Sequence, residues 1–359
     1  CFSDLKDYGS IFMNIQLFSI LIPLITTYIM IRLLRPIALR INLTDQPNDR
    51  KIHSGAIPLI GGVAMFFGVQ VTILLLPHDL NEFKYFLLSS LIIVGIGVLD
   101  DNSDIPVLTR ITFQLIVAII VISLGGVSVM SLGNLFGNGD ILLNGWSYFF
   151  SVIAIIVGMN AVNMADGLHG LAGGNSLVSF LSISFLSINS LLESSLLISL
   201  LFCIVLPVFL MHNLCIGVSS NKRIFMGDAG SMFIGLSLVW VLFEFSQGEA
   251  RTFPPVIALW LIAFPLIEIA STVFRRLNSG VSPFKPDSFH THHVLIKLGF
   301  SEKKTLIVIL TFSILMAITG ILGERYLIDE YLMLLSFVLV FIIHYISISF
   351  AIKKIKNIN

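Results

Sequence analysis

The sequence predicts an all-α, polytopic integral membrane protein with about eleven transmembrane helices. Of its 359 residues, 56% are hydrophobic and only 12% are charged, whereas soluble domains carry about 25% charged residues. Apolar runs long enough to cross a bilayer as helices recur along the whole chain. The runs lie near residues 11–33, 57–76, 84–99, 108–125, 147–164, 170–189, 195–215, 230–246, 253–274, 304–323 and 330–351.

The distribution of Lys and Arg predicts the orientation of these helices. An odd number of spans places the two chain ends on opposite faces of the membrane. Of the 21 Lys and Arg residues, all but Lys6, Lys84, Arg251 and Arg325 fall on the face that holds the C-terminus. The positive-inside rule makes that face cytoplasmic and places the N-terminus outside. No loop is long enough to bury a core of its own, so residues 1–359 are expected to form a single membrane-embedded domain.

The net charge and the cysteine spacing limit the kinds of partner that this chain is expected to bind. The net charge is zero and no basic tail is present, which argues against nucleic acid and leaves the lipid bilayer as the predicted surrounding. The three cysteines show no spacing typical of a metal site or a disulfide framework. The oligomeric state stays open, with a homodimer among the alternatives.

An acid between two glycines marks the start of one apolar run. Asp228 lies between Gly227 and Gly230, where the polar stretch 223–231 meets the apolar stretch 232–245. A carboxylate at the middle of a spanning helix costs about 2.5–3.5 kcal/mol, so Asp228 is expected at the membrane edge with a cation. The glycines let backbone amides approach an anion, and the N-terminus of the following helix favours phosphate. The alternative is an Asp that caps its own helix.

A pair of acids ends the third run. Asp100 and Asp101 are adjacent, and Asp104 follows three residues later. Adjacent carboxylates repel each other, so one of them has a raised pKa unless a cation neutralises both. The pair is therefore a candidate for a magnesium ligand, a proton acceptor, or one of each. The alternative is a solvated helix end.

Polar residues recur every three positions at the end of the fifth run. Asn160, Asn163 and Asp166 share this spacing, and His169 follows within Gly167–Gly170. A spacing of three keeps the side chains on one stripe of a helix. Two amides and a carboxylate suit recognition of a base or a sugar, whereas hydrogen bonding between helices is the structural alternative.

A basic, histidine-rich loop follows the ninth run. His290, His292 and His293 come shortly after Arg275 and Arg276. Imidazoles beside guanidinium groups are typical of an anion site, because the guanidinium fork matches phosphate oxygens. Zinc is the alternative for clustered histidines. No thiolate supports it, and nearby oxygen ligands favour magnesium.

Together the polar loops of one face indicate phosphoryl transfer. The first of these loops adds Arg50, Lys51 and His53, which either bind a diphosphate or only anchor the chain at the membrane. The inventory supplies metal ligands, cations for developing charge and a carboxylate to accept a proton. The many spans imply a lipid substrate. A transporter is the rival class, but it requires polar residues near the bilayer midplane.

The order and spacing of these strings resemble the polyprenyl-phosphate N-acetylhexosamine-1-phosphate transferases. The resemblance runs from Asp45 to the last apolar run, and its motifs are 45–48, 57–62, 100–101, 160–170, 225–231 and 282–293. It implies transfer of N-acetylglucosamine-1-phosphate from UDP-N-acetylglucosamine to undecaprenyl phosphate, with release of UMP and with Mg²⁺ or Mn²⁺. It also implies the bacterial inner membrane and the first membrane step of O-antigen or enterobacterial common antigen synthesis.

The resemblance assigns roles by position. Asp228 is expected to bind the metal, and Asp100 and Asp101 to serve the lipid phosphate and the metal, with Asp100 as the proton acceptor. The residues expected at the nucleotide are Asn160, Asn163 and Asp166. Those expected around the diphosphate and the sugar are Arg276, His290, His292 and His293.

Two positions depart from the family pattern. His169 stands where the family usually has a second acid, so it can bond a phosphate or a sugar but does not bind magnesium as a carboxylate does. Glu268 stands where close relatives carry Asp. The alternative within the same chemistry is therefore another UDP-N-acetyl-hexosamine as donor.

Overall fold

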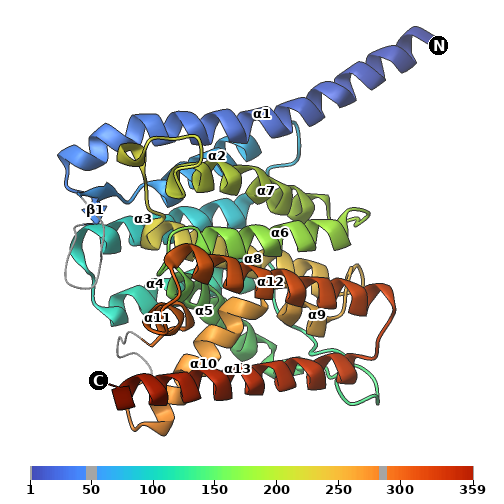
Figure 1. The fold of residues 1–359 in the computed structure, drawn as a ribbon. Coiled ribbons are helices and arrows are strands. Elements are labelled where there is room, and N and C mark those ends of the chain that lie inside the picture. The colour runs from blue at the N-terminus through green and yellow to red at the C-terminus, as the bar shows by residue number, and fades with distance from the viewer. Residues whose placement is uncertain (1, 46–54, 283–288, 359) are drawn as a thin grey trace.

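The computed structural model describes residues 2–45, 55–282 and 289–358, and they are almost entirely helical (Figure 1). The helices are α1 (Phe2–Arg40), α2 (Gly61–Leu75), α3 (Lys84–Ser103), α4 (Val107–Ile119), α5 (Ser147–Ala165), α6 (Leu171–Ser187), α7 (Glu193–Asn213), α8 (Gly227–Ser246), α9 (Pro255–Leu261), α10 (Ala263–Asn278), α11 (Thr291–Lys297), α12 (Glu302–Arg325) and α13 (Glu330–Ile358). Two short strands, β1 (Thr44–Asp45) and β2 (Ile57–Pro58), pair antiparallel. The all-α prediction is confirmed.

The number of candidate spans is lower than the sequence predicts. Among the described residues, eight helices are long and apolar enough to cross a membrane, or up to nine if the bent pair α9–α10 is one span. Each apolar run does form a helix or a bent pair, but α2 has 15 residues and α6 has 17, fewer than the roughly 20 that a full span needs. The count of eleven is therefore not confirmed.

A sharp bend separates α9 from α10. The two helices meet at an angle of 86°, and Pro265 lies in the first turn of α10. Proline has no backbone N–H and its ring clashes with the carbonyl four residues earlier, so Pro265 favours a break of the helix near residue 261.

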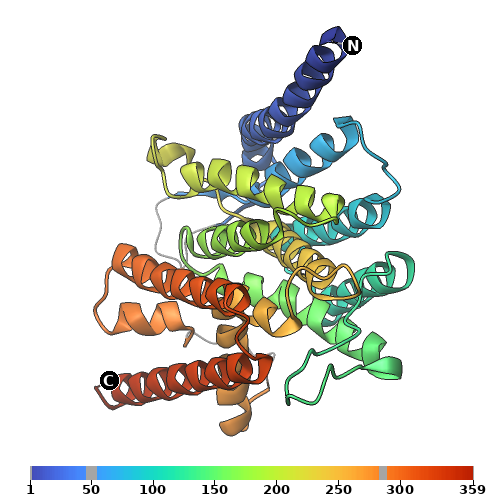
Figure 2. The ribbon, with the colours of Figure 1, turned by 90° about the vertical axis from the view of Figure 1, so that its right-hand side faces the viewer.

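Helix α8 is the centre of the molecule. It is buried along almost its whole length and packs against α2, α3, α5 and α7 (Figure 2, gold). Glycines allow the closest approaches, because a Cβ at Gly62 would overlap the backbone of Gly230 and a Cβ at Gly97 would overlap the backbone of Ala229. Small residues at such crossings let helix backbones touch in membranes. The start of α8 therefore lies against the start of α2 on one side and the last turns of α3 on another.

Backbone hydrogen bonds fix the segment that enters α8. Phe225 donates its N–H to Pro58 O, and its own carbonyl accepts from Gly61, each at 2.9 Å. Gly62 donates in the same way to Met226 O, also at 2.9 Å. The segment before α8 is therefore held by the end of β2 and the first two residues of α2.

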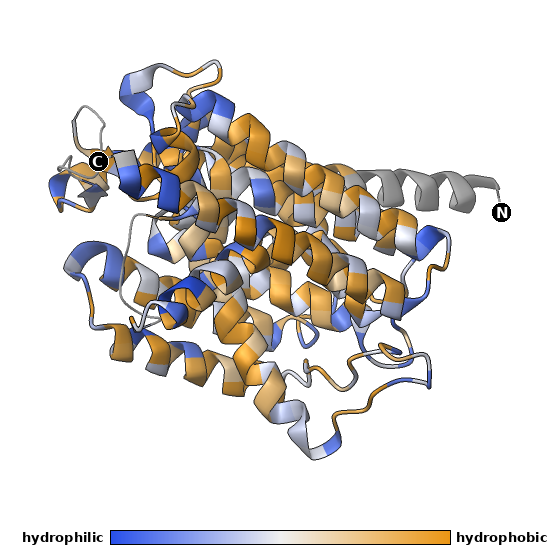
Figure 3. Ribbon diagram, turned by 60° about the horizontal axis from the view of Figure 1, so that its bottom comes forward, coloured by the Kyte–Doolittle hydropathy of each residue, from blue (hydrophilic) through white to orange (hydrophobic). Residues whose placement is uncertain are grey.

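The surface has an apolar belt with polar ends. Hydrophobic residues dominate the middle of the helices and hydrophilic residues gather at the ends (Figure 3). Large apolar side chains such as Leu335, Leu339 and Ile343 of α13 are more than half exposed, which is typical of a lipid-facing surface. The start of α1 and the end of α13 lie at opposite ends of the bundle (Figure 1).

Candidate active site

A cavity of about 760 Å³ opens at the end of the bundle where β1 and α11 lie (Figure 1). Its walls come from β1, the end of α3, the turn after α5, the start of α8 and α11. The predicted site residues that line it are Asp100, Asp101, Asn163, Asp166, His169, Asp228 and His293. Segments far apart in the sequence thus meet at one cavity, as the sequence predicts.

Asp101 caps the start of α8. Its Oδ1 accepts the N–H of Asp228 at 2.8 Å, and its Oδ2 accepts the N–H of Ala229 at 3.3 Å. Gly227 has a φ of +74° there, and a Cβ at this position would overlap the Asp101 carboxylate. A carboxylate is favourable at the positive end of a helix. The expectation that these amides bind a phosphate is not met, because Asp101 already occupies them.

Asp228 does not cap its own helix. The N-cap residue of α8 is Met226, which makes no side-chain cap. Asp228 Oδ1 instead accepts from Asn163 Nδ2 at 2.6 Å, and Asn163 also donates to Ser231 Oγ at 2.9 Å. The capping alternative is therefore wrong, and the Asp228 carboxylate is oriented by α5.

Arg110 of α4 joins two of the acids. Its Nη1 lies 2.9 Å from Asp100 Oδ2 and 3.5 Å from Asp228 Oδ2. Asp100 is only 5% exposed, and its Oδ1 also accepts the N–H of Ile105 at 3.1 Å. Arg110 is not among the site residues predicted from the sequence. The available signal was a lone cation in an apolar span, which marks a functional position by default.

Asn160 lies apart from the cavity. Its Nδ2 donates to Gln114 Oε1 of α4 and to Ile156 O of its own helix, both at 2.8 Å. These are the contacts of the structural alternative, hydrogen bonding between helices. The stripe is therefore divided: Asn163 and Asp166 reach the cavity, while Asn160 joins α5 to α4.

The cavity is strongly acidic. The carboxylates that line it are those of Asp45, Asp100, Asp101, Asp104, Asp166, Asp228 and Glu302, and within the described ranges no Lys or Arg lines it. Desolvation by the surrounding protein, together with the neighbouring carboxylates of Asp228, Asp101 and Asp45, raises the pKa of Asp166 well above its ordinary value. Such a surplus of negative charge favours binding of a cation.

His169 contacts a cation and an aromatic ring. Its Nε2 lies 3.3 Å from Arg223 Nη1, and because a guanidinium only donates, Nε2 is the acceptor and Nδ1 carries the proton. The ring centroid lies 5.0 Å from that of Phe225, at an interplanar angle of 35°. The position of the family acid is thus occupied here by a neutral imidazole beside an arginine.

The three histidines of α11 and its N-cap have different environments. His293 lines the cavity. His292 is 2% exposed and packs directly against Gly167, and this burial, with His293 nearby, lowers the pKa of His292 to about 3. His290 lies 3.0 Å from Glu268 through Nδ1. Of the three, His293 is therefore the residue that reaches the cavity.

Two groups of predicted residues remain. Arg276 is buried and does not line the cavity. Arg50, Lys51 and His53 of the first loop, and residues 283–288 of the histidine-rich loop, lie outside the described residues.

The donor chemistry of the cavity suits a hard divalent cation. Within residues 2–45, 55–282 and 289–358, no three carboxylate, imidazole or thiolate groups form a ready-made metal site. The groups present are mainly carboxylate and amide oxygens, which Mg²⁺ and Mn²⁺ prefer. The described wall holds two histidines, His169 and His293, and no cysteine; carboxylates outnumber these imidazoles, so zinc fits less well than a hard cation.

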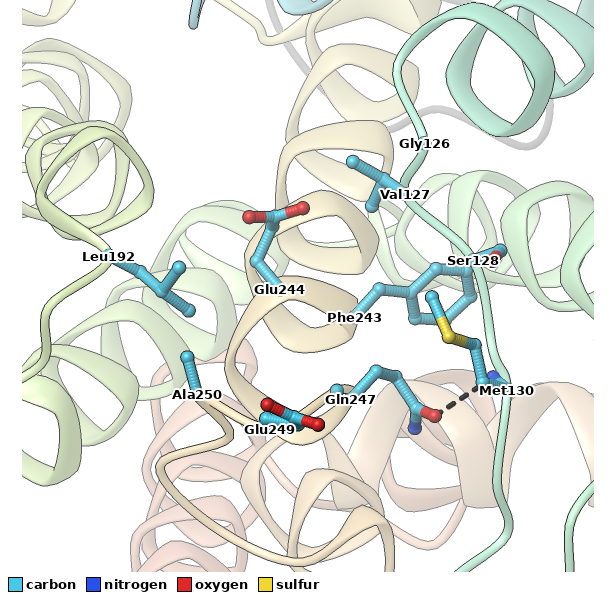
Figure 4. A pocket seen from close by; sticks show the side chains of 11 residues that line it. Gly126, Val127, Ser128, Met130, Leu192, Phe243, Glu244, Gln247, Glu249 and Ala250 are labelled. Atoms are coloured by element: carbon cyan, nitrogen blue, oxygen red, sulfur yellow. Dashed lines mark hydrogen bonds between the residues drawn. The ribbon is translucent and has the colours of Figure 1, made fainter.

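A second cavity lies toward the other end of α8 (Figure 4). Its volume is about 170 Å³, and Glu244 and Glu249 are in its wall. Gln247 Oε1 accepts the N–H of Met130 at 2.9 Å there (Figure 4, dashed line). Glu244 is about 24 Å from Asp228 along the helix, and in the described chain no residue lines both cavities. A continuous polar route, as a transporter requires, is therefore not indicated.

Comparison with known proteins identifies the family of this chain. Residues 83–246 match the model of glycosyl transferase family 4. An Escherichia coli (strain K12) protein named undecaprenyl-phosphate alpha-N-acetylglucosaminyl 1-phosphate transferase is 35% identical over 330 residues, which cover 90% of each chain. Proteins of the same name from Yersinia pestis (36% identity, 86% of this chain, 85% of theirs) and Haemophilus influenzae (37% identity, 93% of this chain, 94% of theirs) are similar. The chain therefore belongs to the polyprenyl-phosphate N-acetylhexosamine-1-phosphate transferases of glycosyl transferase family 4 and is a membrane-embedded glycosyl-1-phosphate transferase.

Proposed function

We propose that this enzyme transfers N-acetylglucosamine-1-phosphate from UDP-N-acetylglucosamine to undecaprenyl phosphate and releases UMP. The observation that carries the proposal is the meeting of Asp100, Asp101 and Asp228 in one cavity, with Arg110 between two of them. The names of the relatives support the sugar and the lipid. Because these relatives are bacterial, we also propose the bacterial inner membrane and the first membrane step of O-antigen or enterobacterial common antigen synthesis.

The proposed orientation places the cavity at the cytoplasmic face. The cavity lies at the end of the bundle where α13 ends (Figure 1), and the exposed Lys353 and Lys354 belong to that end. The positive-inside rule makes it cytoplasmic, where a UDP-sugar is available. About eleven spans with the N-terminus outside remain our proposal for the topology, with α2 and α6 as short spans.

We propose that Asp228 and Asp101 hold a magnesium or manganese ion. Both carboxylates face the acidic cavity, and both substrates are anions that such a cavity repels in the absence of a cation. When bound, the ion neutralises charge on the diphosphate. Asn163 orients Asp228 through the 2.6 Å hydrogen bond, and the two α8 amides orient Asp101.

The reaction is a displacement at phosphorus. An oxygen of undecaprenyl phosphate attacks the β-phosphorus of the UDP-sugar, and the bond between that phosphorus and the UMP oxygen breaks. Asp100 lines the cavity and is proposed as the proton acceptor, while Arg110 and Ile105 fix the positions of its two oxygens. Arg110 offsets negative charge between Asp100 and Asp228 while the transferred group gains charge.

The remaining cavity residues contact the donor. Asn163 and Asp166 are proposed at the nucleotide, His169 at a phosphate or the sugar, and His293 at the diphosphate. The identity of the sugar has one specific alternative, because His169 and Arg223 form a pair at the position of the family acid. This alternative is another UDP-N-acetyl-hexosamine.

The test uses purified enzyme in detergent with undecaprenyl phosphate. Radiolabelled UDP-N-acetylglucosamine and UDP-N-acetylgalactosamine are offered singly, and both UMP and the extracted lipid product are measured. We expect a glycosyl diphosphate lipid from UDP-N-acetylglucosamine, loss of the product with a chelator, and recovery with Mg²⁺ or Mn²⁺. Product from N-acetylgalactosamine alone would identify the alternative, and product from neither sugar would refute the proposed donor.

A further inference from the structure

A buried carboxylate outside the cavity is devoted to the histidine-rich segment. Glu268 of α10 is 1% exposed and does not line the cavity. Its Oε1 lies 3.0 Å from His290 Nδ1 and accepts the N–H of Thr291 at 3.1 Å. Its Oε2 accepts the hydroxyl of Thr291. Both oxygens are thus engaged by two consecutive residues at the start of α11.

The hydroxyl of Thr291 extends this network to the last helix. Thr291 Oγ1 also lies 3.1 Å from Nε2 of His344, in α13. A hydroxyl has a single proton, which it donates to Glu268, so it accepts from the N–H of His344. The hydrogen bonds therefore run in one direction, from His344 through Thr291 to Glu268.

The contacts of Glu268 and Thr291 also fix the positions of the three histidine rings. The rings of His290 and His292 are parallel, with centroids 5.8 Å apart and an interplanar angle of 3°, and the His292 and His293 rings are 4.2 Å apart. His292 is wedged against Gly167, and His293 reaches the cavity. The first turn of α11 is therefore held on one side by Glu268 and on the other by the turn after α5.

Folding stability alone does not explain a buried carboxylate such as Glu268 beside His290. A buried charged pair is often less stable than well-packed apolar residues of similar volume. Glu268 nevertheless directs these hydrogen bonds to the segment that carries His293, rather than to neighbours on α10. These contacts orient the segment that carries His293, and a side chain that acts on the diphosphate has to be held in a defined orientation.

We propose that Glu268 is a positioning residue of the transfer reaction, and that Thr291 links it to His344, so that α13 helps to fix the place of the histidines. The proposal rests on the proposed function in one respect: the group that is positioned, His293, acts on the UDP-sugar. Glu268 does not contact the substrates. It acts through the first turn of α11.

The first test needs no substrate. Hydrogen exchange of the peptide that covers α11 is measured by mass spectrometry on the full-length protein in detergent. Glu268→Gln replaces one acceptor oxygen by an amide donor, and Thr291→Val removes the hydroxyl with little change of shape. We expect α11 to exchange roughly ten- to hundredfold faster in both variants, while the peptide from α8 stays unchanged. Thr319→Val is the matched control, since this exposed hydroxyl bonds only within α12.

The second test asks whether the network acts as a unit. His344→Phe is expected to speed α11 exchange, and combining it with Thr291→Val should add little, because the second change removes a link that is already broken. In steady-state assays, Glu268→Gln should lower kcat roughly ten- to hundredfold while KM for undecaprenyl phosphate changes less than about twofold. Glu268→Asp, which keeps both oxygens, should recover part of kcat.

The outcomes separate this inference from the proposed function. If α11 exchange responds as expected but the parent enzyme forms no lipid product from UDP-N-acetylglucosamine, the function fails and the network stands. If the parent enzyme forms the product while α11 exchange and kcat of Glu268→Gln equal those of the parent, the positioning role is overturned. Strictly additive effects of His344→Phe and Thr291→Val would overturn the link to α13.

Discussion

The replacement of Arg110 by methionine tests the charge arrangement of the site most directly. Methionine keeps most of the side-chain volume and removes the cation. At 2.9 Å from Asp100, the gross Coulomb term is about 6 kcal/mol at an effective dielectric constant of about 20. Arg110 is 22% exposed and Asp228 is 34% exposed, so solvent screening reduces the expected loss of folding stability to about 1–3 kcal/mol.

The expected loss of activity is larger than the loss of stability. Arg110 does not line the cavity and acts through the carboxylates of Asp100 and Asp228. Misplacement of reacting groups can lower the rate by about 10², and we expect a loss of kcat of this order for Arg110→Met. Arg110→Lys should retain part of kcat, because it restores the charge without the guanidinium fork. The assay is UMP release by purified enzyme, with thermal unfolding measured on the same samples. A kcat for Arg110→Met within about threefold of the parent value would refute the role of Arg110 in the reaction.

Three further predictions concern other residues of the site. Asp228→Asn should abolish UMP release with little change in thermal unfolding, because the amide keeps the shape but not the charge of a metal ligand; unchanged turnover would exclude the metal role. His292 has a pKa of about 3 in the folded protein and about 6.5 when unfolded, so below pH 6.5 the unfolded state binds more protons and stability falls by up to about 1.4 kcal/mol per pH unit. His292→Gln should therefore flatten the dependence of the unfolding temperature on pH between 7 and 5, and equal slopes would contradict the buried neutral imidazole. Asn163→Leu should lower kcat by about tenfold or more, because Asp228 loses an orienting donor, whereas Asn160→Leu should lower the unfolding temperature and leave KM for the UDP-sugar unchanged; the reverse pattern would show that Asn160 is the residue at the nucleotide.

The acids of the site could be predicted from the sequence. In a chain with so few charges, Asp100, Asp101 and Asp228 stand out because each lies at the end of an apolar run, where a carboxylate is costly without a function. The predicted topology places the end of the third run and the start of the eighth run on the same face of the membrane. Asp100, Asp101 and Asp228 are therefore expected on one side of the bundle. The family motifs then gave the chemistry.

The partners of these acids could not be predicted in the same way. Asp101 can cap α8 only because α3 and α8 approach each other closely, which their small residues permit. The presence of glycines in the sequence does not by itself show which two helices meet. Arg110 does show a signal in the sequence, because it is a lone cation in an apolar run. Within the distribution of Lys and Arg, however, it serves only to predict the orientation of the helices. The number of spans is not confirmed for a different reason, since hydropathy does not fix the length of helices such as α2, which has 15 residues and is largely buried.

The contact between α3 and α8 also bears on attempts to make this enzyme more heat-resistant. Exchanging glycine for alanine within helices is a common route, with a gain of up to about 1 kcal/mol per position. Two glycines of α3 behave oppositely: an added methyl group at Gly95 meets nothing within 4 Å, whereas at Gly97 it strikes the backbone of Ala229. A substitution at the first position leaves the contact between α3 and α8 unchanged, and at the second it would push apart the two helices that carry the proposed catalytic acids.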